Sequence, residues 1–285
     1  MIARFYSFST VQPPMAQSGS MARPLAMHFR QTVERLPSVW LCAQMALGAF
    51  ITLLGAPTAA AADGTWTNNS NSTWDTASNW SGSTIADGSG FTADFSSLAL
   101  SNNRTVTLDS SRTIGALVFG NASGTRLRTW TLARSNSSVL TLAGESTPTI
   151  TISGSGPGTA VNISAILAGT QGLTFAGTSG TISGSGILTL SGANTYTGLT
   201  TVLGGTLAYG TSNVIASGGV TVDGATAVLS LGNNHSDTVG TITVANGGSI
   251  TASGSSTLTS TGSFEMQSGP HHGDRQFHTH QHRHL

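Results

Sequence analysis

The sequence predicts an all-β protein and favours a right-handed parallel β-helix, in which each turn of the chain stacks on the turn before it. Three observations support this fold class. Glycine accounts for 36 of 285 residues and charged residues for only 8%, so strand and turn formers outnumber helix formers. Short runs alternate apolar and small polar residues, and a turn signal follows most of them. No run of helical periodicity separates them, which argues against alternating strands and helices.

The repeated runs define a predicted strand array at residues 97–268. Each run places two apolar side chains on one face of a strand and a Thr, Ser or Ala between them on the other. The inward residues are mostly Val, Leu and Ile of similar size, which suits coils stacked on coils like themselves. A β-sandwich remains the alternative because it also consists of short strands and turns. The runs include "TVTL" (105–108), "ALVF" (116–119), "TWTL" (129–132), "VLTL" (139–142), "TITI" (149–152), "ILTL" (187–190), "GVTV" (219–222) and "TITV" (241–244).

The first 62 residues have the order of a secretory leader. Arginines precede an apolar segment at 38–56, and the small residues of "PTAAAAD" follow it. Cleavage between Ala62 and Asp63 would remove Cys42, the one cysteine, and leave a chain without disulfides. We therefore predict a signal peptide in residues 1–62 and export across the inner membrane, with no membrane span after cleavage. An uncleaved anchor is the alternative.

Two other segments flank the array. Residues 63–96 are rich in Trp and Asn and are predicted to cap its N-terminal end, whereas residues 269–285 are predicted to be a disordered, histidine-rich tail. Four histidines of the tail alternate, so an extended strand would place their imidazoles on one face, where they would bind nickel, copper or zinc in vitro. No carboxylate shell accompanies them, and we predict no physiological metal site. These residues are His278, His280, His282 and His284.

One stretch carries a more specific signature, "GILTLSGANTYTGLTTVLGGTLAYG" at 186–210. It resembles the autotransporter-associated β-strand repeat, also called the passenger-associated transport repeat. The segment "GTWTNNSNSTWDTASNWSG" (64–82) is similar to the opening of large bacterial secreted proteins built from such repeats. The matching positions are Leu188, Leu190, Gly192, Asn194, Thr195, Tyr196, Thr197, Gly198, Thr200, Val202, Gly205, Thr206 and Leu207.

The resemblance implies a secreted or cell-surface passenger that acts as a stalk, coat or adhesive surface. An autotransporter also needs a membrane barrel with many alternating strands. We expect none in this chain, because the sequence turns polar after Met266.

Each residue type in the signature also has a structural interpretation. We expect its apolar residues to point into one coil and its glycines to lie at corners, where a side chain would be penalised. Asn194 is expected at a turn, where its amide satisfies backbone groups, and Tyr196 is expected to cap the coil with its hydroxyl in water. The apolar residues are Leu188, Leu190, Val202 and Leu207, and the glycines are Gly192, Gly198, Gly204 and Gly205.

The acidic residues give no sign of an active site. They are scattered singly, and His235 with Asp237 is interpreted as a polar loop and not as part of a catalytic triad. We predict neither an enzyme nor a cofactor, although acids distant in sequence could meet across turns. A polysaccharide-degrading enzyme therefore remains a minor alternative. The acids are Asp75, Asp87, Asp94, Asp109, Glu145, Asp223 and Asp237.

The three tryptophans of the N-terminal segment are the candidate binding residues. Trp66, Trp74 and Trp80 could form a flat platform that stacks on sugar rings, which would make the chain a glycan-binding module. The competing interpretation is that they cap the first turn of the coil. Expected partners are extracellular glycans or cell-surface proteins. A formal net charge of +0 argues against nucleic acid.

Overall fold

The computed structural model describes most of the predicted cap and array. The leader before Ala60 and the histidine-rich tail, with the alternating histidines, lie outside the described residues. The described residues are 60–122, 126–153, 158–178, 186–215 and 217–267.

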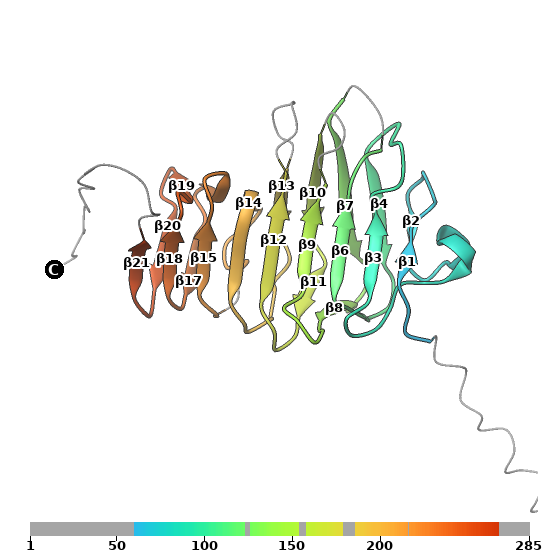
Figure 1. Ribbon diagram of the computed structural model, residues 1–285, viewed down its shortest axis with the longest axis horizontal. Coiled ribbons are helices and arrows are strands. Elements are labelled where there is room, and N and C mark those ends of the chain that lie inside the picture. The colour runs from blue at the N-terminus through green and yellow to red at the C-terminus, as the bar shows by residue number, and fades with distance from the viewer. Residues whose placement is uncertain (1–59, 123–125, 154–157, 179–185, 216, 268–285) are drawn as a thin grey trace, which may run out of the picture. The chain divides into compact units, whose positions relative to one another are not determined.

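The described chain forms a parallel β-solenoid of about eight turns, as Figure 1 shows. Every pairing between named strands is parallel, and the paired strands lie a full turn apart in the chain. The all-β prediction and the β-helix prediction are confirmed, and the sandwich alternative is wrong, because the ladders run between successive turns. Two short 3₁₀ helices, η1 (Ala77–Asn79) and η2 (Ser81–Ser83), interrupt the N-terminal region.

Three faces enclose the core. The first face contains β1 (Gly64–Thr65), β3 (Thr92–Phe95), β6 (Ala116–Phe119), β9 (Thr149–Ile152), β12 (Leu173–Gly177), β15 (Val220–Asp223), β18 (Ile242–Ala245) and β21 (Phe264–Gln267). The second contains β2 (Ser72–Thr73), β4 (Arg104–Leu108), β7 (Arg128–Arg134), β10 (Thr159–Ile163), β13 (Ile187–Leu190), β16 (Ala227–Asn233) and β19 (Ser249–Ser253). The third consists of two separate sheets. One contains β5 (Arg112–Ile114), β8 (Val139–Leu142) and β11 (Ile166–Ala168), and the other contains β17 (Ser236–Val239) and β20 (Thr257–Ser260). The long strand β14 (Thr200–Tyr209) joins the first face to the second.

The turns differ in length although their strands stay aligned. Ala116 pairs with Thr149 one turn later, whereas Thr200 pairs with Val220, so the turns are shorter toward the C-terminal end. The extra residues of a longer turn therefore lie in the corners between the faces.

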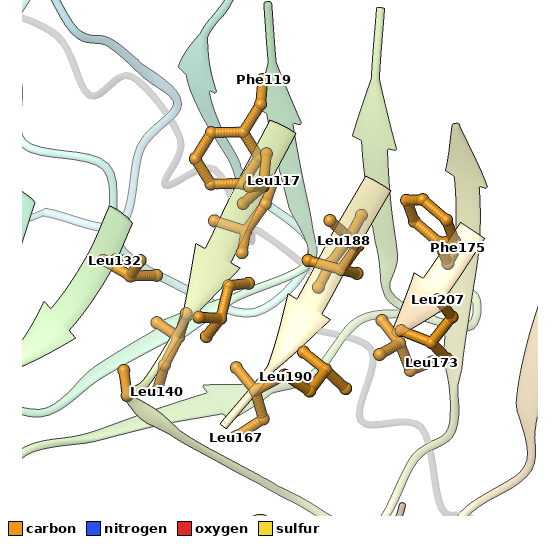
Figure 2. Close-up of a cluster of buried hydrophobic side chains, with 14 of the residues drawn as sticks. Leu117, Phe119, Leu132, Leu140, Leu167, Leu173, Phe175, Leu188, Leu190 and Leu207 are labelled. Carbon is orange, nitrogen blue, oxygen red and sulfur yellow. The ribbon is translucent and has the colours of Figure 1, made fainter. Parts of the chain in front are cut away.

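The core consists of aliphatic columns that follow the solenoid axis. Leu117 aligns with Ile150, which aligns with Phe175, and the column continues in Val202 and beyond. Figure 2 shows such side chains gathered inside the coil. Leu188, Leu190, Val202 and Leu207 are all fully buried. This confirms the prediction from the sequence that these side chains point into the coil.

Corner side chains hold each turn to the next. The Asn71 side-chain oxygen accepts the backbone N–H of Thr105 at 3.0 Å, and Asn103 accepts that of Thr129 at the same distance. These contacts satisfy backbone donors at the starts of strands, where no ladder partner is available. They explain why Asn and Ser are frequent between the strands.

Candidate functional site

The N-terminal tryptophans lie inside the coil. Trp66 and Trp74 are 0% exposed and Trp80 is 2% exposed. The ring centroids of Trp66 and Trp80 are 5.1 Å apart in an edge-to-face arrangement, and Trp74 lies 5.1 Å from Trp80. Phe95 packs against all three rings, so the four aromatic side chains form one cluster under the first turn.

The polar edges of these rings are also occupied. The indole N–H groups of Trp66, Trp74 and Trp80 donate to the backbone carbonyls of Asn68, Ala86 and Trp74 at 2.6, 3.0 and 2.7 Å. A sugar can stack only on a ring face that solvent reaches. The structure therefore corrects the hypothesis of a glycan platform at these residues. The indole rings are packed inside the first turn, and their N–H groups donate to backbone carbonyls.

Two of the scattered acids meet across turns of the coil. Asp75 and Asp87 both bind the guanidinium of Arg112, at 2.7 and 2.8 Å. Burial disfavours the charge on Arg112, but its hydrogen bonds to Asp87 and Asp75 outweigh this and raise its pKa. The two acids are distant in sequence and meet at Arg112, a possibility that the sequence analysis left open, and the contact joins the N-terminal segment to β5.

The Arg112→Ala variant should lower the free energy of unfolding by about 1–3 kcal/mol, because two partly buried carboxylates would lose their shared cation. Urea denaturation at low salt would measure this loss. Arg134→Ala is the matched control, since Arg134 is exposed and donates only to the nearby Asn136 carbonyl. Equal losses in the two variants would contradict a stabilising role for the Arg112 contacts.

A second acid lies buried near the middle of the shorter turns. Asp237 is 4% exposed, and its carboxylate accepts the N–H groups of Ile215 at 3.0 Å and Thr238 at 2.7 Å. Burial raises the pKa of Asp237, and burial together with the Asp237 charge raises the pKa of the neighbouring Tyr209 hydroxyl. His235 points elsewhere, with its Nδ1 at 2.8 Å from the Leu231 carbonyl.

Raising the pH should cost the wild type stability through Asp237. A carboxyl whose folded pKa is raised stabilises the fold most below its unfolded pKa of about 3.9, and that stability is lost as the pH rises through the folded value. Unfolding free energies measured from pH 3 upward, in wild type and in the Asp237→Asn variant, test this. As the pH rises, the free energy of unfolding of the wild type should fall relative to that of the variant. A difference between the two that does not change with pH would contradict this prediction.

The signature stretch is structural in its details. Asn194 accepts the N–H of Leu167 at 2.9 Å and donates to the Val214 carbonyl at 2.8 Å, so one amide links three turns. This confirms that its amide satisfies backbone groups. The expectation for Tyr196 is wrong, because its ring is 0% exposed and its hydroxyl lies 2.8 Å from Thr200 Oγ1 instead of in water.

A row of threonines on the first face was not singled out from the sequence. Thr149, Thr174, Thr201, Thr221 and Thr243 align in register from β9 to β18 without interruption. Each is half-buried between two inward-facing residues and therefore faces outward. Within the described chain, none of the five hydroxyls hydrogen-bonds another residue. The signal was present, since a Thr recurs beside the buried residues of these strands, but only the register shows that the threonines form one row.

In the described ranges, no group of three or more His, Cys, Asp or Glu side chains could hold a metal ion. Among the same residues, no helix has the length and apolar character needed to cross a membrane.

The predicted cleavage position is tied into the fold. Ala62 and Asp87 exchange two backbone hydrogen bonds, of 2.8 and 3.1 Å, in an isolated antiparallel bridge. Cleavage between Ala62 and Asp63 would remove this bridge.

Comparison with known families finds one match. Residues 181–208, which include β13 and most of β14, match the model of the passenger-associated-transport-repeat. Neither the curated proteins nor the solved structures gave a match to this chain. The chain thus carries one passenger-associated-transport-repeat, which lies within its parallel β-solenoid and contributes the Asn194 link between turns.

Proposed function

We propose that the chain is an exported, non-catalytic β-solenoid that acts as a structural or adhesive surface outside the cell. The passenger-associated-transport-repeat and the leader-like residues 1–62 support the export part of this proposal. The threonine row, defined by Thr149, Thr174, Thr201, Thr221 and Thr243, is the observation that carries the adhesive part.

The row offers hydroxyls at the spacing of neighbouring strands, about 4.8 Å. Each hydroxyl is both a donor and an acceptor, and within the described chain none is engaged by another residue. A repeated set of such groups suits an extended polymer that presents hydroxyls at regular intervals. An extracellular glycan is the partner of that chemistry.

The test is binding of the full chain to a panel of immobilised polysaccharides. The Thr201→Glu/Thr221→Glu variant places two charges in the row and should weaken binding by at least about tenfold. The matched control is Thr131→Glu/Thr189→Glu, on β7 and β13 of the second face, which should bind like the wild type. Equal binding by both variants would contradict a role for the row.

Reducing-sugar release on the same panel tests the non-catalytic part. We expect none, because the carboxylates of Asp75 and Asp87 are already held by Arg112. Release that depends on Asp75 and Asp87 would favour a polysaccharide-degrading enzyme instead. N-terminal sequencing of the exported protein, with Asp63 as the expected first residue, tests the leader.

A further inference from the structure

The two ends of the solenoid differ in how they are closed. At the N-terminal end, the outermost strands β1 and β2 have 2 residues each, and the tryptophan cluster fills the coil behind them. At the C-terminal end, β19, β20 and β21 have 5, 4 and 4 residues. Each of these three pairs with a single strand of the preceding turn, so its outer edge has no ladder partner among the described residues.

Among the described residues, the apolar columns also continue into the last turn of the coil without a cap. Phe264 aligns with Ile242 and Met266 with Val244, so both belong to columns that are buried elsewhere in the coil. Ile242 is 2% exposed, whereas Phe264 and Met266 are 54% and 50% exposed. The terminal turn of a solenoid needs a polar outer surface to remain soluble alone. This turn instead presents large apolar side chains beside open strand edges.

We infer that this C-terminal end is an interface on which a second copy of the chain docks end to end. Open strand edges bind other strands through their backbone groups, and apolar side chains at alternate positions add the buried contact. The three terminal strands contain one charged residue, Glu265, so little charge opposes the close approach of two such ends.

The rest of the chain indicates which partner binds the C-terminal end of the solenoid. The large apolar residues of 268–285 are Phe277 and Leu285. Side chains of one strand that extend neighbouring columns lie two residues apart, as Phe264 and Met266 do, so Phe277 and Leu285 cannot extend both columns from one strand. The N-terminal end offers only two-residue strands over a filled coil, so stacking of one copy's N-terminal end on another's C-terminal end is not favoured. Two C-terminal ends meeting face to face use the same surface twice and give a closed dimer.

Sedimentation and light scattering of the full chain over a concentration series test the dimer. The wild type should reach twice the mass of one chain, and Phe264→Lys/Met266→Lys should remain a monomer. The matched control is Leu199→Lys/Leu203→Lys, which changes one leucine just before β14 and one within it; they are 48% and 47% exposed but lie on a lateral face. This control should dimerise like the wild type, and circular dichroism should show that both variants keep the fold.

Hydrogen exchange identifies what covers the edge. Protection of the β19, β20 and β21 amides should rise by at least about tenfold between dilute and concentrated wild-type protein. Protection that is independent of concentration would assign the edge to residues 268–285 and overturn the dimer. The inferred dimer would also be overturned by a wild type that stays monomeric, or by a dimer that is lost only in Leu199→Lys/Leu203→Lys.

Discussion

Replacing Trp74 by Ala should cost about 3–5 kcal/mol of unfolding free energy, which is among the largest effects expected for a point substitution in this chain. The side chain is 0% exposed, and its ring centroid lies 5.1 Å from that of Trp80 and 5.5 Å from that of Phe95. Removal of the ring would leave a cavity at the end of the coil, where only short strands and 3₁₀ turns could close over it. It would also leave the Ala86 carbonyl without its 3.0 Å donor.

Urea denaturation followed by circular dichroism measures this loss. Leu203→Ala is the matched control, because Leu203 is a large apolar residue that is 47% exposed and lies away from both ends of the coil. We expect the control to change stability by less than about 1 kcal/mol. A Trp74→Ala variant as stable as the wild type, with impaired glycan binding, would restore the binding interpretation of the tryptophans.

The second large effect concerns the corner within β14. Gly205 has φ +71°, and a Cβ added there would overlap the Gly186 carbonyl oxygen and lie 2.9 Å from Gly177 Cα. Gly205→Ala combines the cost of the left-handed backbone, about 1–2 kcal/mol, with an overlap cost of about 1–3 kcal/mol. We therefore expect a total loss of about 2–5 kcal/mol in the free energy of unfolding.

Gly90→Ala separates the two causes. Gly90 has a similar φ, +83°, but a Cβ added there meets no atom within 4 Å. This variant should lose only the backbone contribution, about 1–2 kcal/mol. Equal losses in the two variants, measured by the same denaturation series, would mean that the close approach of Gly205 to Gly186 and Gly177 contributes nothing.

The fold was predictable because its strands repeat a local pattern. Leu188 and Leu190 flank a Thr, and this alternation alone fixes which face of β13 is buried. Gly205 was likewise predictable at a corner, since the turn chemistry of glycine is local. The signature of residues 186–210 pointed to the same fold independently of periodicity, and the family comparison matches 181–208.

Contacts between turns were not predictable in the same way. Arg112 meets Asp75 and Asp87 only because the lengths of the first turns bring them together, and sequence spacing does not give those lengths. The threonine row depends on the same register. The prediction that the Tyr196 hydroxyl lies in water was wrong because the sequence does not show that Thr200 Oγ1 lies near it inside the coil.

The unequal turn lengths have a consequence for how such a chain can change. Ala116 and Thr149 are paired in register, and so are Thr200 and Val220, although the two turns differ in length. The strand pairing therefore does not depend on the number of residues in the corners. A single residue added within a strand would invert the orientation of the side chains after it. Residues added at a corner lengthen only a surface loop. Evolution or design can therefore graft new recognition loops onto the corners while the stacked framework beneath them stays the same.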